Sequence, residues 1–413
     1  MSDSKRSNFL VFLFVFVDIL GFSIVLPLFP YWRTLFGASP VAVGLLGTAN
    51  ALAQLVAAPV IGVLSDGYGR RPLLLLCLAG TFASFLLMAV SIHNYWLVLA
   101  SRVLDGILGG NISLAQAYVS DITPVGPERS KRLGLLMAAY GLGFTLGPAL
   151  GGVLGNALGR AGPVWLAALL TGANLLGVTL FLPESLPAER RATTYSLDKH
   201  PPATAALRFL ARPHLGPLLL LRFVSGFVFT CVIETAFGFF NDDRLGLSAR
   251  HSSYFMAFVG LIYSLTQSRV AGIIRIYGRR SLLHLSLLVA AAALAFWAGS
   301  TSLAGVVAAA TVYAAVAGTV NTVVYTLITQ VVEQQNVGGT LGLTAAVGSL
   351  TRVVAPTVSG ALIEHFGSAA PHLVCCVLLL VSWPLVGAGI PQSLVDSDLA
   401  DTTARQKDLK KAT

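Results

Sequence analysis

Four ionisable side chains lie inside long apolar stretches, where a charge needs help from its neighbours. Asp18 follows FLVFLFVFV, and Glu234 lies within FVFTCVIETAF. Arg102 and Asp105 are three residues apart in LVLASRVLDGI. In the middle of a membrane helix such a group costs about 2.5–3.5 kcal/mol on insertion scales, so it usually faces a cavity or another charge. Burial favours a neutral carboxyl group and a nearby arginine favours a charged one, which allows a proton to be loaded and released.

These four residues are the expected proton-coupling residues. We expect Asp18 to be the leading proton carrier, Asp105 the next and Glu234 the third, with Arg102 changing their charge as it moves. The same carboxyl groups would attract a cationic or metal-chelated solute, and competition between proton and solute would exchange one for the other. A purely structural alternative also stands, because Arg102 and Asp105 are neighbours on a helix and can form a local ion pair.

The chain as a whole has the composition of a membrane protein. Of its 413 residues, 55% are hydrophobic and only 11% are charged, whereas about a quarter of the residues in soluble domains are charged. A helix crosses about 30 Å of hydrocarbon with about 20 apolar residues. Twelve stretches approach that length and predict an all-α protein in a lipid bilayer, with spans at residues 8–30, 41–63, 73–93, 97–118, 132–154, 164–182, 214–240, 252–272, 281–299, 303–328, 340–363 and 369–391.

Basic residues are unequally distributed between the connections of these spans. If both termini are cytoplasmic, 19 Lys and Arg residues lie on the cytoplasmic side and 4 on the other. Cytoplasmic connections typically carry such an excess, so we expect cytoplasmic termini. The same excess accounts for the pI of about 9.6 without nucleic-acid binding. The first stretch is too long for a signal-peptide core, which predicts a retained first helix.

Short motifs recur in the two halves of the chain. YGRR occurs at 68–71 and at 277–280, and GPALGGVL from Gly147 has the counterpart APTVSGAL from Ala355. A shared offset of 208 to 209 residues predicts two parallel six-helix repeats, an arrangement that builds transporters. The expected domains are an N-terminal bundle at 1–183, a cytoplasmic linker at 184–213, a C-terminal bundle at 214–391 and a cytoplasmic tail at 392–413.

Several segments of the N-terminal half carry a family resemblance. GVLSDGYGRRPL at 62–73, SRVLDGILGG at 101–110, GFTLGPALGG at 143–152 and DILGFSIVLPLFP at 18–30 resemble motifs of the major facilitator superfamily. YVSDIT, ERS and FLPES are similar to segments of its drug:proton antiporters, tetracycline exporters in particular. The resemblance covers essentially the whole chain. It implies the major facilitator fold of two pseudo-symmetric six-helix bundles, and transport by alternating access.

The resemblance also implies a gate in the connection between the second and third spans. In the family, the arginine matching Arg70 pairs with the acid matching Asp121, and the counterpart of Asp66 interacts with a helix end in the other half. Such a cluster can hold one side closed. The simpler alternative is a positive-inside loop with turn glycines. The second copy has Arg275 in place of Asp66, so the latch should be asymmetric. The expected gating residues are Gly62, Asp66, Gly69, Arg70, Arg71 and Asp121.

Small residues and a proline mark the fifth span. In the resembling family this motif is characteristic of antiporters, which implies a kinked, closely packed seam that limits leakage. Close helix packing alone is the alternative, because small residues three or four apart let helix backbones approach in lipid. The residues concerned are Gly143, Gly147, Pro148, Gly151 and Gly152.

Polar and aromatic residues on other spans are the expected substrate-binding residues. Each can also serve only as a hydrogen-bonding group between helices. Together with the acids, aromatic rings suit amphiphilic or cationic solutes, whereas Arg222 and Arg352 would favour an anion. The set is Asn50, Gln54, Asn111, Gln116, Tyr140, Tyr263, Gln267, Asn321, Tyr325 and Arg352.

These patterns predict a secondary transporter that exports a small amphiphilic or drug-like molecule in exchange for protons. There is no GxxxxGK[ST] loop for ATP and no metal-ligand or catalytic spacing, so we expect neither an enzyme nor a cofactor. Two alternatives remain: a symporter or uniporter for an organic anion or sugar, and a membrane receptor or assembly partner without transport. We expect a monomer in a plasma or bacterial inner membrane rather than an organelle membrane.

Overall fold

The computed structural model describes residues 3–28, 32, 35–123, 127–159, 161–187, 189, 191, 214–331 and 337–391. In these ranges the chain forms helices and turns, without a strand. It divides into two compact units, one from Met1–His200 with Gly246–Phe258 and the other from Pro201–Leu245 with Val259–Thr413. Most of the expected linker and all of the expected tail lie outside the described residues.

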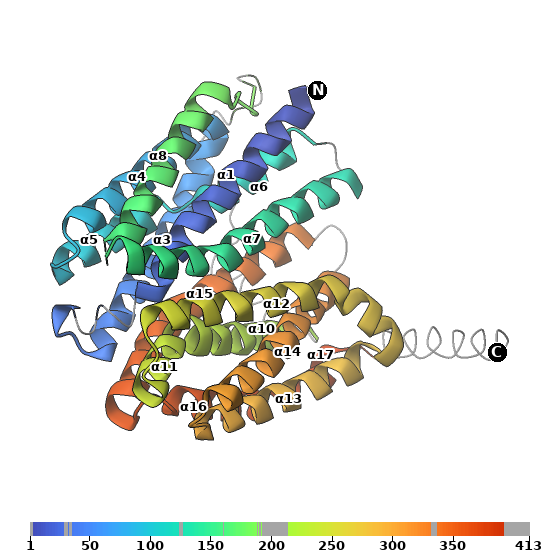
Figure 1. Ribbon diagram of the computed structural model, residues 1–413. Coiled ribbons are helices and arrows are strands. Elements are labelled where there is room, and N and C mark those ends of the chain that lie inside the picture. The colour runs from blue at the N-terminus through green and yellow to red at the C-terminus, as the bar shows by residue number, and fades with distance from the viewer. Residues whose placement is uncertain are drawn as a thin grey trace, which may run out of the picture. The chain divides into compact units, whose positions relative to one another are not determined.

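Helices build the first unit almost entirely (Figure 1). Helix ends follow local chemistry: Ser39 accepts a hydrogen bond from the amide of Ala42 at the start of α3, and Asn94 accepts from Trp96 and Leu97 at the start of α5. The elements are α1 (Asp3–Val25), the short 3-10 helix η1 (Leu26–Leu28), α3 (Pro40–Tyr68), α4 (Arg70–Val90), α5 (Tyr95–Ile107), α6 (Asn111–Asp121), α7 (Pro127–Ala157) and α8 (Gly162–Phe181).

The second unit has a corresponding series of helices (Figure 1). One helix, α12, has residues in both units. The elements are α10 (Leu215–Phe229), the π-helix η4 (Thr230–Ala236), α11 (Phe237–Leu245), α12 (Ala249–Tyr277), α13 (Arg279–Gly299), α14 (Leu303–Gln330), α15 (Val337–Phe366), α16 (Ala370–Ser382) and α17 (Leu385–Gly389).

Equivalent helices pack in the same pairs within each unit. In the first, α1 packs on α7, and α4 packs on both α5 and α8. In the second, α10 and η4 pack on α15, and α13 packs on both α14 and α16. The repeated packing agrees with the sequence repeat. It therefore supports two six-helix bundles built to one plan.

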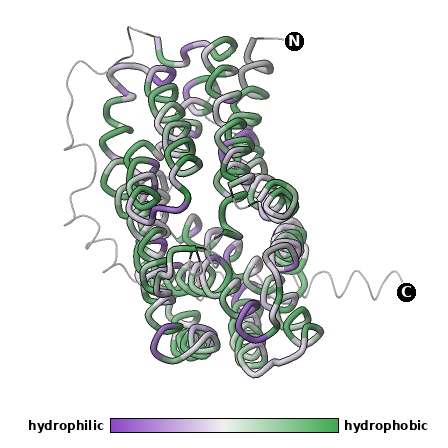
Figure 2. The backbone as a smooth tube through the Cα atoms, turned by 60° about the vertical axis from the view of Figure 1, so that its left-hand side comes forward, coloured by the Kyte–Doolittle hydropathy of each residue, from purple (hydrophilic) through white to green (hydrophobic). Residues whose placement is uncertain are grey.

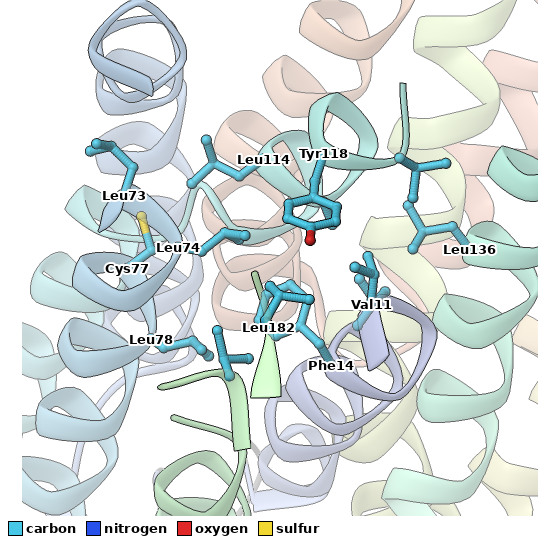
Figure 3. Close-up of a cluster of buried hydrophobic side chains, with 14 of the residues drawn as sticks. Val11, Phe14, Leu73, Leu74, Cys77, Leu78, Leu114, Tyr118, Leu136 and Leu182 are labelled. Atoms are coloured by element: carbon cyan, nitrogen blue, oxygen red, sulfur yellow. The ribbon is translucent and has the colours of Figure 1, made fainter. Parts of the chain in front are cut away.

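The core of the first unit is a continuous apolar cluster between α1, α4, α6 and α7 (Figure 3). Phe14, Leu78 and Tyr118 are among its fully buried members. The one polar atom of Tyr118 is satisfied, because its hydroxyl donates to the carbonyl of Pro183 at 2.8 Å. Lipid chains are as apolar as these side chains, so the cluster holds the four helices together through close van der Waals packing.

The helices also have the length and the exposed surface of membrane spans. Among the described residues, nine helical segments are long and apolar enough to cross a bilayer, and Phe9–Val25 and Ala370–Ser382 are shorter apolar helices. Leu169, Leu176 and Leu180 of α8 are 63–71% exposed. Figure 2 shows hydrophobic residues along most of these helices. Such surfaces are stable against lipid chains but not against water, which makes this a multi-pass membrane protein.

Four expected spans are not continuous α-helices, and the first span changes to the 3-10 helix η1 at Leu26. The fourth stops at Ile107 and restarts at Asn111, across Gly109 and Gly110. The seventh contains η4, and the twelfth breaks before α17. Pro384, which lacks an amide hydrogen, lies at the last of these breaks. The other described residues of the expected spans are helical except at span ends, as at residues 91–93.

Candidate functional site

Asp18 lies in a buried polar cluster in the first unit. Its carboxyl Oδ1 accepts a hydrogen bond from Asn111 Nδ2 at 2.8 Å, and the same amide lies 3.4 Å from the hydroxyl of Thr81. Asp18 is 9% exposed and Asn111 is 4% exposed. The side chains come from α1, α6 and α4, which the apolar cluster packs together. Three sequence-distant helices thus surround one carboxyl group.

Asp105 and Arg102 extend this cluster along α5. Arg102 Nη1 is 3.6 Å from Asp105 Oδ2, and its Nη2 donates to the hydroxyl of Ser84 at 3.3 Å. Asn50 Nδ2 donates to Asp105 Oδ2 at 2.9 Å. The carboxyl groups of Asp18 and Asp105 also act on each other electrostatically. The cluster therefore holds two carboxyl groups and one guanidinium group away from solvent.

The interruption between α5 and α6 shapes this cluster. Gly106 packs so closely on α3 that a Cβ there would overlap the carbonyl of Asn50. The backbone carbonyl of Gly109 accepts a hydrogen bond from Gln54 Nε2 at 2.7 Å. Asn111 is the first residue of α6 and points into the cluster from that end. Irregular backbone within a span is tolerated where protein groups satisfy it, and it often marks binding sites in transporters.

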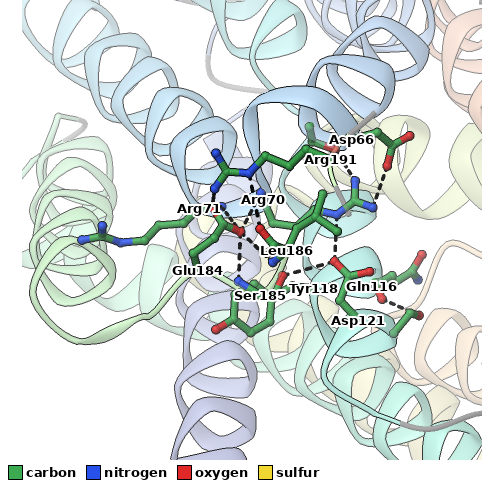
Figure 4. Close-up of polar contacts among 12 residues, drawn as sticks. Asp66, Arg70, Arg71, Gln116, Tyr118, Asp121, Glu184, Ser185, Leu186 and Arg191 are labelled. Atoms are coloured by element: carbon green, nitrogen blue, oxygen red, sulfur yellow. Dashed lines mark hydrogen bonds and ion pairs between the residues drawn. The ribbon is translucent and has the colours of Figure 1, made fainter. Parts of the chain in front are cut away.

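The loop motif forms a second charged cluster (Figure 4). Arg70 Nη2 is 2.6 Å from Asp66 Oδ1, and its Nε is 3.0 Å from Asp121 Oδ2. Gly69, between α3 and α4, has φ +104°, a conformation that favours glycine. Arg71 Nη2 donates to the carbonyl of Thr179 at 2.6 Å. Gly62 has open space around it.

Glu184 completes the loop cluster, although the sequence motifs did not single it out. Its Oε1 accepts from the amide of Arg70 at 2.9 Å, and its Oε2 accepts from the amide of Arg71 at 3.2 Å. A carboxylate in this position stabilises the positive end of a helix dipole. A Cβ at Gly69 would also overlap this carboxylate. The signal available in the sequence was FLPES itself, an acid directly after a span.

The glycine motif of α7 forms the contact with α1. A Cβ at Gly143 would lie 2.8 Å from the carbonyl oxygen of Phe16, and one at Gly147 or Gly151 would overlap Ser23 or Ile24. Ser23 donates to the carbonyl of Gly143 at 2.8 Å. The motif therefore lies at a close helix contact. Both interpretations of the sequence, an antiporter seam and close packing alone, require such a contact. Pro148 and Gly152 are buried on the same helix.

Glu234 and Arg352 belong to a separate polar group in the second unit. Thr230 donates to Glu234, and the charge of Arg352 acts on it. Arg352 Nη2 donates to the hydroxyl of Ser349 at 3.4 Å. Glu234 lies on η4, and wide turns of this kind are frequent at functional sites.

The remaining expected substrate residues divide between the units. In the first unit, Asn50, Gln54 and Asn111 belong to the Asp18 cluster, whereas Tyr140 stacks on Phe144 at 6.3 Å. Gln116 accepts at its carbonyl from Ser120. The second unit holds the others, which are partly exposed: Tyr263, Gln267, Asn321, Tyr325 and Arg352.

The sequence profile of the Major Facilitator Superfamily matches residues 11–293 and 270–397. The chain belongs to the major facilitator superfamily. It is 30% identical over 418 residues to human major facilitator superfamily domain-containing protein 10, covering 89% of each chain. It is 31% identical over 273 residues to the class C tetracycline resistance protein of Escherichia coli, covering 65% of this chain and 67% of that one.

Solved structures agree with this assignment. The crystal structure of the human organic anion transporter MFSD10 (TETRAN) has a TM-score of 0.69 and 27% identity, and covers 94% of this chain and 100% of that one. A D-xylose-proton symporter, at 16% identity and a TM-score of 0.76, has the same fold and covers 94% of this chain and 98% of that one. The expected fold and the family resemblance are confirmed. As a major facilitator protein, the chain is a multi-pass membrane transporter of small molecules and not an enzyme.

Proposed function

We propose that this transporter exchanges protons for a small amphiphilic solute and exports that solute. The observation that carries the proposal is the charge of the cluster around Asp18. Two buried carboxyl groups, those of Asp18 and Asp105, lie in a cluster with one guanidinium group: Arg102 pairs with Asp105, and the described partner of Asp18 is the neutral amide of Asn111. An uncompensated buried charge is costly, so one bound proton makes the cluster neutral.

Proton release would follow from the hydrogen bond to Asn111. An amide donor stabilises the charged carboxylate, and Asp18 and Asn111 are on different helices, α1 and α6. A shift of α1 relative to α6 changes that bond and with it the affinity of Asp18 for a proton. If the shift accompanies the opening of one side, proton release is coupled to the direction of access.

The loop cluster would be the gate in this cycle. Arg70 bridges Asp66 and Asp121, which lie at the ends of α3 and α6. Because Asp66 is 52% exposed while Arg70 is only 11% exposed, Asp66 is the partner that can leave most readily. We propose that its release frees one side to open, with both termini cytoplasmic and the protein acting as a monomer in a plasma or inner membrane.

A second candidate function is transport of an organic anion. The human relative of known structure is named an organic anion transporter. In this chain Arg222 stacks on Tyr325, and the described contacts of its guanidinium include no carboxylate. A transporter can exchange protons for an anionic solute. The second candidate therefore concerns the charge of the solute, and the first concerns its exchange for protons.

A liposome experiment tests proton exchange. Full-length protein is reconstituted with a pH-sensitive dye inside, a pH gradient is imposed, and cationic, zwitterionic and anionic aromatic compounds are added. We expect at least one compound to release protons along the gradient, and D18N to reduce that flux about tenfold or more. The matched control is D242N, because Asp242 is an exposed acid on α11. Wild-type flux in D18N would overturn the proposal.

A further inference from the structure

Arg222 is a membrane-embedded arginine whose donor groups are mostly unused. Its guanidinium carbon lies 4.9 Å from the centre of the Tyr325 ring, and Nη2 lies 3.5 Å from the hydroxyl of that tyrosine. The second distance is at the long limit for a hydrogen bond. Nε is buried without a hydrogen-bond partner among the described residues. Arg222 is itself partly exposed, so a ligand can reach it.

Two other arginines within spans, Arg102 and Arg352, are differently placed. Arg102 lies close to Asp105, and Arg352 acts on Glu234. Arg222 has no comparable carboxylate among its described contacts. A lone cation within a span is costly unless it meets water or an anion. The positive charge of Arg222 is therefore available to a ligand.

Two glycines make room for the guanidinium. A Cβ at Gly226 would lie 3.0 Å from Nη1, and a Cβ at Gly348 would lie 3.2 Å from Nη2. Both distances are tighter than ordinary van der Waals contact. The guanidinium thus lies between α10 and α15, with one face covered by a ring of α14. Its position is fixed by neighbours rather than by an ion pair.

Aromatic side chains lie further along the same helix. Phe229 is seven residues after Arg222, which corresponds to two turns on one face and about 10 Å. Its ring centre is 5.2 Å from that of Tyr263. A charged group at one end and an aromatic pair at the other suit a molecule with an anionic head and an aromatic body.

We propose that Arg222 binds the anionic group of the transported solute, and that the solute is a small aromatic carboxylate. The two terminal nitrogens of a guanidinium can donate side by side to a carboxylate. Tyr325 holds the guanidinium plane, and Gly348 lets Nη2 lie close against α15. The assignment rests on the second candidate function, transport of an organic anion, and it adds the aromatic body of the solute and the contacts that hold Arg222 in place.

Equilibrium binding of tritiated 2-naphthoate to the full-length protein in lipid nanodiscs tests the assignment, with 2-naphthylmethanol as the neutral competitor. We expect saturable binding that the alcohol displaces poorly. R222Q should weaken naphthoate binding about tenfold or more and abolish the preference over the alcohol. R222K keeps the positive charge but lacks the planar guanidinium group, so its affinity for naphthoate should lie between those of wild type and R222Q. R269Q, an exposed arginine of α12, should bind like wild type.

Several outcomes would overturn the assignment: no saturable naphthoate binding by wild type, equal competition by the alcohol, or unchanged binding in R222Q. If R222Q fails to fold, G348A gives a second test, because a methyl group beside Nη2 should lower affinity without removing charge. The measurement uses no gradient, so it reports solute binding without requiring proton exchange. Loss of proton exchange with retained binding, or the reverse, therefore separates a failure of this assignment from a failure of the proposed function.

Discussion

The two six-helix units pack in the same helix pairs but differ in how they treat buried charge. In the first, Arg102 is close to Asp105, and Asp18 is held by Asn111. In the second, Arg222 stacks on a tyrosine and has no carboxylate among its described contacts. Helix packing depends on size and shape, which many apolar substitutions preserve. Polar interiors depend on a few side chains, so a repeat can keep its architecture while its two interiors acquire different chemistry.

The same contrast appears where the glycine-rich helices pack. In the first unit Gly151 contacts the backbone of α1 too closely for any side chain. The matching residue of the second unit is Ser359, which donates to the carbonyl of Cys231 at 3.0 Å. One unit uses close backbone approach and the other uses a hydrogen bond at the equivalent contact.

The largest effect should come from removing the compensated arginine. R102M leaves the buried carboxyl group of Asp105 without its cation and should lower the free energy of unfolding by about 3–5 kcal/mol. R222M loses a stacking contact worth about 0.5–2 kcal/mol but also removes a cation that has no carboxylate among its described contacts, so its net effect should be well below that of R102M. Thermal unfolding of both variants in one detergent measures the difference. The double variant R102M/D105N should recover part of the loss. Equal effects of the two single variants would contradict the contrast in charge.

The next effect concerns the helix contacts. G151S inserts a side chain where the carbonyl of Ile24 already lies, and overpacking of this kind costs about 1–3 kcal/mol. S359G removes one interhelical hydrogen bond and should cost about 0.6 kcal/mol. Unfolding midpoints and the yield of monodisperse protein provide the comparison. If S359G proved the more damaging, the two contacts would not differ in the way described.

A smaller effect is expected at the start of α4. E184A removes the acceptor for the amides of Arg70 and Arg71 and should cost about 1 kcal/mol. E184Q keeps an acceptor and loses only the charge, which should cost about 0.3–1 kcal/mol at low salt. Unfolding at two salt concentrations separates the two terms, since only the charge term is screened. A salt-independent loss in E184Q would argue against the charge term.

The smallest effect is expected for an exposed pair. Glu128 lies 2.5 Å from Arg132 but is 64% exposed. Such a pair contributes at most about 0.5 kcal/mol in stability, so E128Q should unfold within a degree or two of wild type. A decrease in unfolding temperature as large as that of R102M would show that the number of ion pairs, rather than their burial, controls stability in this protein.

The spans could be predicted from the sequence because the apolar runs themselves are the signal. Breaks within spans could not be placed in the same way. Gly109 and Gly110 are visible in the sequence, but glycines are also abundant in unbroken α7. The break is stabilised because Gln54 donates a hydrogen bond to the carbonyl of Gly109, and this contact joins the break to the separate helix α3.

The site was predictable in residue type more than in arrangement. An acid in an apolar run identifies Asp18 as unusual, but its partner Asn111 is 93 residues away. No local spacing relates the two, because the contact depends on how three helices pack. Glu184 was missed because it follows a span and resembles an ordinary loop acid. The sequence shows the charge of Arg222, whereas the space that Gly226 and Gly348 leave for its guanidinium group is a property of the folded chain alone.

The π-helical turn η4 changes how the seventh span can vary in length. The backbone hydrogen bonds of a π-helix join residues five apart instead of four, so η4 (Thr230–Ala236) accommodates one residue more than an α-helix would. Side-chain directions extrapolated from α10 at 3.6 residues per turn are consequently wrong by about 100° in α11. The rings of Phe237 and Phe240, at 5.9 and 6.5 Å from that of Trp297, would keep their orientation if this extra residue were deleted. During evolution a single-codon deletion is therefore survivable at η4, whereas in the unbroken helix α13 it would rotate everything downstream.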